Sequence, residues 1–250
     1  MSDDIYDSYS YYYDLLYRDK SYLKETEYIK DLLSDNNVLG DDILEFGSGT
    51  GKHGSILSDY GYKVHGIERS AKMLSKAKKK INFSFQQGDI SSINLNKKYD
   101  AVISLFHVIS YQTTNKNLKM VFTNAAKHLK IGGLFIFDFW YSPAVYKQIP
   151  SIRIKRISDE KVKITRLAEP KIFHNENKVE VKYTIFVKNV MTDQTQVFQE
   201  VHPMRHFSLP ELDMISNDHG FKYIKSEEFL TGNQASENTW GLCMVLRKIK

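Results

Sequence analysis

The sequence contains few of the residues that would commit it to a special environment. Cys243 is the single cysteine among 250 residues, so no disulfide can form within the chain, and this favours a reducing compartment. No stretch approaches the roughly 20 consecutive apolar residues of a membrane helix. Residues 1–4 are polar and acidic, unlike a secretory signal. We therefore expect a cytoplasmic protein that does not contact a membrane.

Strong charge of one sign and metal-ligand clusters are also missing. The formal net charge is only +5, and the densest basic run, residues 72–80, has the pattern of a solvated helix face. No motif typical of nucleic-acid binding occurs, so no nucleic-acid partner is expected. His202 and His206 are four residues apart, a spacing that brings metal ligands together on a helix, whereas the alternating pattern there favours a strand. We therefore predict no metal.

Ordinary globular patterning is present instead, with 42% hydrophobic and 26% charged residues. Two helices are expected within residues 4–34, with a break near residues 18–20. Apolar runs then predict strands over residues 41–46, 62–67, 81–86, 99–105 and 134–139. Helical spacing and caps predict helices over residues 51–60, 70–80 and 115–129. This alternation predicts an α/β fold, a mostly parallel Rossmann-like sheet with helices on both faces.

The pattern changes after residue 150. Residues 151–206 alternate in polarity, as in residues 179–185 and 195–199, which predicts an inserted small antiparallel β-sheet. Ser208 and Glu211 have the spacing of a capping box at the start of a helix that Gly220 ends. Two last strands, over residues 221–230 and 239–247, complete the core, the last one antiparallel. The predicted division is a helical cap (1–40), a cofactor-binding core (41–150), an inserted lobe (151–206) and a C-terminal completion (207–250).

The first predicted strand leads into a glycine-rich loop. Gly47, Gly49 and Gly51 alternate there, which lets the backbone turn sharply and approach a ligand closely. In a doubly wound sheet, ligands bind at the carboxyl ends of the strands. Glu68 ends the second strand, where it is placed to accept hydrogen bonds from both ribose hydroxyls of an adenosine. Asp89 follows the third strand and is placed to accept from the adenine amine.

The same loop also fits a dinucleotide fingerprint, since Gly49, Gly51 and Gly54 have the spacing G-x-G-x-x-G. A dinucleotide would place its pyrophosphate over the following helix. Glu45, just before the first glycine, would repel a pyrophosphate but could hold the ammonium group of a methionine moiety. Together with the acid at Asp89, this favours S-adenosylmethionine over NAD as the cofactor. An NAD-dependent oxidoreductase remains a less favoured alternative.

The sequence resembles class I S-adenosylmethionine-dependent methyltransferases over essentially its whole length. The resemblance is carried, in order, by Glu45-x-Gly47-x-Gly49-x-Gly51, Glu68, Gly88-Asp89, Tyr99-Asp100-Ala101-Val102 and Leu129-Lys130-x-Gly132-Gly133. More narrowly, it is similar to enzymes that N,N-dimethylate amino sugars attached to a nucleotide diphosphate. That similarity is carried by Tyr12-Tyr13-Asp14-Leu15-Leu16-Tyr17, Phe139-Trp140-Tyr141-Ser142-Pro143, the inserted sheet and Glu200-Val201-His202.

The resemblance has one departure. The sugar enzymes carry a histidine after the fourth strand that points at the acceptor amine, whereas this chain has Tyr111 at that place and His107 one turn earlier. The acceptor therefore stays open between the amine of a nucleotide-linked sugar and a hydroxyl of a sugar or another small polar molecule. A hydroxyl would need a positioned base. Our catalytic candidates are His107, Tyr111, Tyr17 and His202.

The remaining candidate residues follow the same scheme. The predicted cofactor-binding residues are Tyr13, Glu45, Gly47, Ser48, Gly49, Gly51, Glu68, Arg69, Met73, Gly88, Asp89, Ile90, Leu105 and Phe106. The predicted substrate-binding residues are Trp140, Tyr141, Arg166 and Arg205, the arginines as partners for a diphosphate. The predicted function is methylation of a small molecule, with N-methylation of a nucleotide-linked amino sugar favoured over O-methylation, and a non-catalytic cofactor-binding protein is a further alternative. A homodimer through an edge of the inserted sheet is possible on this pattern.

Overall fold

The computed structural model describes residues 15–250, and its core is one mixed β-sheet. The strands follow the order β3-β2-β1-β4-β5, all parallel, and β11 and then β10 continue the sheet in antiparallel fashion beside β5. Their bounds are β1 (Asp42–Phe46), β2 (Lys63–Glu68), β3 (Phe83–Gln87), β4 (Tyr99–Ser104), β5 (Leu129–Tyr141), β10 (Phe221–Glu228) and β11 (Gly241–Lys248). The strand order reverses direction between β1 and β4, which are neighbours in the sheet. A ligand is therefore expected beyond the carboxyl ends of these two strands.

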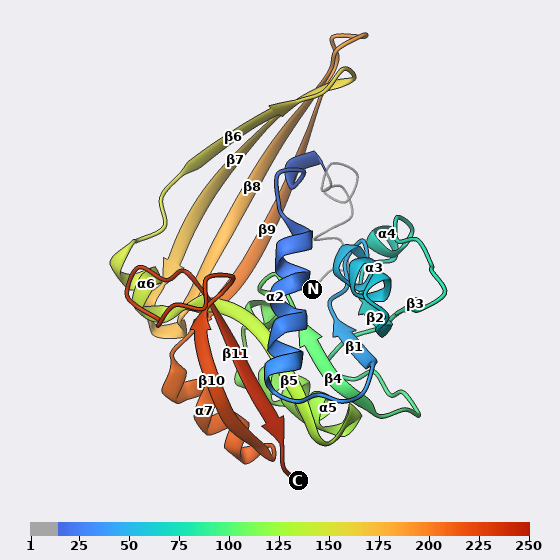
Figure 1. Cartoon of the computed structure of the whole chain (residues 1–250). Helices are drawn as coiled ribbons and strands as arrows, with labels where there is room; N and C mark the ends of the chain where they lie inside the picture. The colour runs from blue at the N-terminus through green and yellow to red at the C-terminus, as the bar shows by residue number, and fades with distance from the viewer. Residues whose placement is uncertain (1–14) are drawn as a thin grey trace.

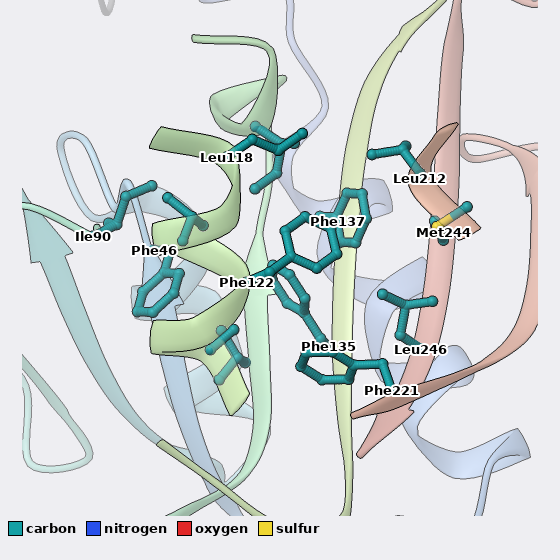
Figure 2. Packing of buried hydrophobic residues seen from close by; sticks show 14 of the residues in the cluster. Phe46, Ile90, Leu118, Phe122, Phe135, Phe137, Leu212, Phe221, Met244 and Leu246 are labelled. Carbon is teal, nitrogen blue, oxygen red and sulfur yellow. The ribbon is translucent and has the colours of Figure 1, made fainter. Parts of the chain in front are cut away.

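Helices cover both faces of this sheet (Figure 1). On one face lie α2 (Tyr22–Asp35) and α3 (Lys52–Asp59), and on the other α5 (Asn115–His128) and α7 (Leu209–Asp218). Figure 2 shows Phe122 of α5 facing Phe135 and Phe137 of β5, where the ring centroids are 5.4 and 5.6 Å apart. Fully buried aromatic rings of this kind fix the layers firmly. Among residues 15–250, no helix is long and apolar enough to cross a membrane.

The inserted lobe is a four-stranded antiparallel sheet that extends away from the core (Figure 1). It consists of β6 (Arg153–Ser158), β7 (Val162–Phe173), β8 (Lys178–Asn189) and β9 (Thr195–Phe207), and follows α6 (Ser142–Lys147). The last residues of β5 pair with the end of β9, Trp140 with His206, which joins the lobe to the core. Leu16 is fully buried in a cluster that includes Ile164 of the lobe and Met73 beside the core, so the segment before α2 packs between the two.

The predicted fold class is confirmed, and the differences are local. The helix predicted over residues 70–80 is only α4 (Ala71–Leu74) followed by turns. Met73 is the single buried residue of α4, and the lysines after it offer no apolar face to hold further turns against the sheet. The strand predicted over residues 134–139 begins already at Leu129, because the chain passes directly from α5 into β5. Neither α6 nor the 3₁₀ turn η1 (Val108–Tyr111) was predicted from the sequence.

The predicted capping box at the start of α7 is wrong. Ser208 occupies the cap position, but its side chain makes no capping hydrogen bond. Glu211 pairs instead with Arg205 at the end of β9. A carboxylate bonds more strongly to a guanidinium group than to a backbone amide. Glu211 therefore pairs with Arg205 of β9 and does not complete the capping box.

Candidate active site

A cavity of about 540 Å³ opens at the carboxyl ends of the parallel strands. Its walls come from the loops that follow β1, β2, β3 and β4, together with η1 and the start of α5. Twelve of the residues predicted for the site line it: Gly47, Ser48, Gly49, Glu68, Arg69, Met73, Gly88, Asp89, Ile90, Leu105, Phe106 and Tyr111. Residues from four separate loops therefore meet where the sequence predicted a cofactor.

The glycine loop takes a conformation that other residues rarely adopt. Gly47, Gly49 and Gly51 have φ angles of 74°, 56° and 77°, all in the left-handed region. A Cβ on Gly47 would stand 2.5 Å from Val108, and one on Gly51 would stand 2.8 Å from Phe83. Gly51 does not line the cavity, although it was predicted to bind the cofactor. It contributes to the shape of the loop and to the close packing against Phe83. The cavity wall itself is formed by Gly47 and Gly49.

Glu68 is held rigidly at the wall of this cavity. Its Oε2 accepts a hydrogen bond from the Gly49 amide at 2.9 Å, and its Oε1 accepts one from the Ser70 amide at 2.8 Å. Burial is the largest influence on the Glu68 carboxyl and raises its pKa, against the lowering by these amides. A carboxylate offers about four acceptor positions. The two amides leave acceptor capacity for a neighbouring pair of hydroxyls, as a ribose diol would provide.

Asp89 lies at the exposed mouth of the cavity, where a local turn orients its side chain. Its Oδ1 accepts hydrogen bonds from the Ser91 amide at 2.8 Å and from the Ser91 hydroxyl at 2.7 Å. A carboxylate fixed through one oxygen presents the other in a defined direction, which suits an amine donor on a ligand. Gly88 beside it has no room for a side chain, since a Cβ would lie 2.8 Å from Ile93.

Glu45 differs from its prediction, because it lies beneath the cavity and is not part of its wall. Its side chain is 2% exposed, and its Oε1 is 3.7 Å from Nδ1 of His53, which does line the cavity. His53 is buried, and its Nε2 is 2.7 Å from Oε2 of Glu25. Among residues 15–250, none makes a well-formed hydrogen bond to Glu45 Oε2. Burial raises the pKa of Glu45 to about 8.

We expect the stability of the ligand-free protein to fall as the pH rises, because of Glu45. Its folded pKa of about 8 lies above the ordinary 4.5, so its contribution is fully present below pH 4.5 and is lost as the pH rises through 8. The loss between these limits amounts to a few kcal/mol at most. Thermal melting of wild type and Glu45→Gln between pH 5 and pH 9 checks this. A Glu45→Gln variant with the same pH slope as wild type would contradict it, and Glu27→Gln on the exposed face of α2 serves as the control.

The loop after β4 is strained and is held by a buried acid. Phe106 and His107 have φ angles of 66° and 61°, and such left-handed non-glycine residues cost about 1–3 kcal/mol each. Asp138 of β5, 1% exposed, accepts from the His107 amide at 3.0 Å and lies 2.8 Å from His107 Nδ1. Although burial acts to raise the pKa of Asp138, the charge and hydrogen bonds of His107 lower it below the ordinary value. The carboxylate thus fixes both the backbone and the ring of His107.

Tyr111 and His202 belong to a second buried polar group. Tyr111 Oη is 2.8 Å from His202 Nδ1, and His202 Nε2 is 3.1 Å from Glu200 Oε2. Glu200 and His202 are both buried and lie two residues apart on one face of β9. Tyr111 and His202, both predicted for the site, are thus in contact with each other. Of the two, Tyr111 alone lines the cavity.

A second cavity, of about 380 Å³, lies on the inserted lobe. It is lined by aromatic and cationic side chains, Trp140, Trp240, Tyr183, Arg153, Lys155 and Arg166. Two of the four residues predicted to bind the substrate, Trp140 and Arg166, are among them. The rings of Trp140 and Trp240 meet edge to face at 5.5 Å, and Arg166 lies 4.8 Å from the centre of the Tyr183 ring.

One group of side chains connects the two cavities. His107 stacks on Phe106 of the first cavity at 5.8 Å and meets Trp140 of the second at 6.3 Å. Tyr17 lies edge-on to Phe106 at 5.1 Å, and its hydroxyl accepts from Arg166 at 3.2 Å. We call Tyr17, Phe106, His107, Tyr111 and His202 the dividing wall. All four catalytic candidates from the sequence belong to it.

Several predicted residues lie elsewhere. Arg205 pairs with Glu211 of α7 and lines neither cavity, because its strand position turns it towards the core helices. Tyr141 packs at the edge of the hydrophobic core and also lines neither. Tyr13 lies outside the described residues.

Two important acids were missed by the sequence analysis. Asp138 stands out as a lone charge in the apolar strand Leu134-Phe135-Ile136-Phe137-Asp138, and this signal could have marked it. Glu200 was seen only as part of a family-like segment, although it shares a strand face with His202. A buried acid two residues from a histidine in a strand is a pattern that could have found this pair.

Comparisons with known proteins agree with this geometry. A family model described as a methyltransferase domain matches residues 43–133. The dTDP-3-amino-3,4,6-trideoxy-alpha-D-glucopyranose N,N-dimethyltransferase of Streptomyces venezuelae is 31% identical over 137 residues, which is 54% of this chain and 58% of that protein. The match thus spans less than two thirds of that relative's length.

Solved structures match over nearly the whole chain. An S-adenosylmethionine-dependent methyltransferase from Clostridium acetobutylicum superposes with a TM-score of 0.81 at 21% identity, covering 98% of this chain and 99% of that one. A sugar N-methyltransferase from a Streptoalloteichus species superposes with a TM-score of 0.80 at 21% identity, covering 95% and 93%.

Residues 43–133 therefore match a methyltransferase domain, and the chain has the fold of solved S-adenosylmethionine-dependent methyltransferases. The narrower resemblance predicted from the sequence, to amino-sugar N,N-dimethyltransferases, is confirmed as well.

Proposed function

We propose that this protein transfers methyl groups from S-adenosylmethionine to the amino group of a nucleotide-linked sugar. The observation that carries this proposal is the pair of cavities on either side of the dividing wall. Methyl transfer needs a donor and an acceptor held close together and in line, so two sites that meet at one wall suit it. The cofactor supplies an electrophilic methyl group when it is bound.

The first cavity has the chemistry to hold the adenosyl cofactor. Glu68 would accept from the ribose hydroxyls, and Asp89 at the mouth would accept from the adenine amine. Met73 and Ile90 supply apolar wall for the base. The ammonium group of the methionine moiety would lie near Gly47, with His53 between it and Glu45.

The second cavity suits a nucleotide diphosphate. Arg153, Lys155 and Arg166 supply positive charge, and arginine forks fit phosphate oxygens in pairs. Trp140 and Trp240 provide flat apolar surface on which a base or a sugar ring can stack. The relative from Streptomyces venezuelae is named for a dTDP-linked amino sugar, an acceptor with both features.

The proposal is tested by incubating the protein with S-adenosylmethionine and a panel of dTDP- and UDP-linked amino sugars. Mass spectrometry of the products is expected to show one and then two added methyl groups on the amino compounds. The matching sugars with a hydroxyl in place of the amine are the control and are expected to stay unmodified. Methylation of the hydroxy compounds alone would replace the amine acceptor with an oxygen.

Arg166→Gln is expected to raise the KM for the nucleotide-linked acceptor about tenfold, because one charge-assisted contact to phosphate is worth about 1.5–3 kcal/mol. The affinity for S-adenosylmethionine should stay unchanged, since Arg166 does not line the first cavity. Arg156→Gln on the exposed part of β6 is the matched control. Steady-state kinetics of the three proteins provide the measurement. An unaltered acceptor KM in Arg166→Gln would place the diphosphate elsewhere.

We further propose a cytoplasmic enzyme with small-molecule substrates, no nucleic-acid partner, and the four-part division of the chain given by the sequence. Its dimerisation would use β6, which forms the outer edge of the inserted sheet. Unpaired strand edges are natural places for association. Light scattering after gel filtration tests this proposal, and a monomer at all concentrations would contradict it.

A further inference from the structure

We propose that Tyr111, His202 and Glu200 form a proton-transfer chain that accepts the proton lost by the acceptor nitrogen. This inference rests on the proposed function. Each transfer to an amine leaves a methylated ammonium, and a proton has to leave before the nitrogen can accept a second methyl group. Tyr111 is the member of the chain that reaches the cavity wall.

The chain runs from the cavity into the inserted lobe. Tyr111 ends the turn η1, and its hydroxyl is 2.8 Å from His202 Nδ1. His202 Nε2 is 3.1 Å from Glu200 Oε2. His202 is 3% exposed and Glu200 is 6% exposed, so bulk water reaches the inner end of the chain poorly. Hydrogen-bonded polar groups in such a poorly hydrated interior couple strongly.

The chemistry of the three groups gives each hydrogen bond a direction when the Glu200 carboxyl is ionised. An ionised Glu200 only accepts, so Nε2 of His202 carries the hydrogen that is donated to it. In a neutral imidazole Nδ1 is then an acceptor, and the Tyr111 hydroxyl donates to it. The chain at rest therefore presents the oxygen of Tyr111 to the cavity as an acceptor, with a base behind it.

The proton steps balance without a net charge on the tyrosine. A proton on the substrate ammonium passes to the Tyr111 oxygen as the O–H proton of Tyr111 passes to His202 Nδ1. The N–H bond of the substrate and the old O–H bond break, while a new O–H bond and the Nδ1–H bond form. His202 becomes an imidazolium beside the Glu200 carboxylate, which stabilises the added charge. Release of that proton to solvent after product leaves restores the chain.

Other candidates in the dividing wall fit this role less well. The Tyr17 hydroxyl already accepts from the cationic Arg166, which disfavours taking up a further proton. His107 Nδ1 faces Asp138, and His107 lines neither cavity. We assign His107 to the placement of the acceptor. Among residues 15–250, Tyr183 of β8 is a further titratable neighbour of His202, with ring centroids 4.9 Å apart, and Arg166 lies on Tyr183.

Kinetics of Tyr111→Phe and His202→Gln test the chain. Both variants are expected to lower kcat about 30- to 100-fold, in the range usual for acid–base groups, with little change in the affinity for S-adenosylmethionine. The acid limb of the kcat–pH profile should disappear in His202→Gln. Tyr146→Phe and His206→Gln are matched controls, because Tyr146 and His206 are hydrogen-bonded away from both cavities and His206 lies on the same strand face. Wild-type kcat and pH profile in both test variants would overturn the proposal.

A spectroscopic test separates this inference from the proposed function. Nitrogen-15 NMR of the histidine side chains, with His202 assigned through His202→Gln, reports which ring nitrogen carries the proton. We expect the Nε2–H form, with an Nδ1 shift that changes in Tyr111→Phe. The Nδ1–H form would overturn the chain even if amino sugars are methylated. If the Nε2–H form is found but no amino sugar reacts, the proposed acceptor is wrong, while the hydrogen-bond order from Tyr111 through His202 to Glu200 is supported.

Discussion

Glu68→Ala is expected to weaken binding of S-adenosylmethionine by at least about 100-fold, since it removes two charge-assisted hydrogen bonds to a ribose diol. The loss has a second source, because the Gly49 and Ser70 amides both donate to this carboxylate and orient the glycine loop. Isothermal titration calorimetry measures the affinity directly. The variant should also bind S-adenosylhomocysteine more weakly by the same factor, because both ligands carry the same ribose.

Glu27→Ala on the exposed face of α2 is the control for the loss of a glutamate. Circular dichroism should show that Glu68→Ala keeps its secondary structure, since Glu68 ends β2 and is not part of the hydrophobic clusters. Full affinity in Glu68→Ala would show that the ribose is held by another group and that the ligand lies elsewhere in the cavity.

Asp138→Asn should destabilise the protein by about 3 kcal/mol and lower kcat at least tenfold. An asparagine places an amide where the carboxylate meets both the backbone amide and the ring of His107, and breaking a buried pair of this kind costs about 3–5 kcal/mol. The strained backbone at Phe106 and His107 would relax, and the dividing wall would lose its shape. Urea unfolding and steady-state kinetics provide the two measurements.

A double-mutant cycle sharpens this prediction. If Asp138 acts by holding His107, the substitution Asp138→Asn should cost less than half as much in a His107→Ala background. The remaining cost comes from the His107 amide, which still donates to residue 138. Equal costs in both backgrounds would show that Asp138 stabilises the strand independently of His107. Asp100→Asn, outside the site and bonded to Lys130, is the control.

The order of elements could be predicted from the sequence because each parallel strand is an apolar run that ends in turn residues. Glu68 is an instructive case, since its place at the end of a strand already put it at the ligand edge. The helix over residues 70–80 failed for a physical reason. Its lysines satisfy helical spacing, but only Met73 is buried against the fold, and propensity alone holds few turns.

The site could be predicted only as far as local patterns reach. The cavity residues follow strand ends, so their meeting is a consequence of topology. Contacts between segments far apart in the chain have no such signal, as with Asp138 beside His107 and Tyr111 beside His202. The second cavity is a further example, because Trp140 and Trp240 are 100 residues apart in the chain and meet where β5 pairs with β11, beside the inserted lobe.

The most direct test of this account is a calorimetric titration of the purified protein with S-adenosylmethionine, S-adenosylhomocysteine and NAD in parallel. The glycine loop alone is compatible with either cofactor class, whereas Glu68 and Asp89 around one cavity favour the adenosyl ligands. We expect micromolar binding of S-adenosylmethionine and S-adenosylhomocysteine and no detectable binding of NAD. Binding of NAD without either adenosyl ligand would contradict the assignment of the cavity and, with it, the proposed methyl transfer.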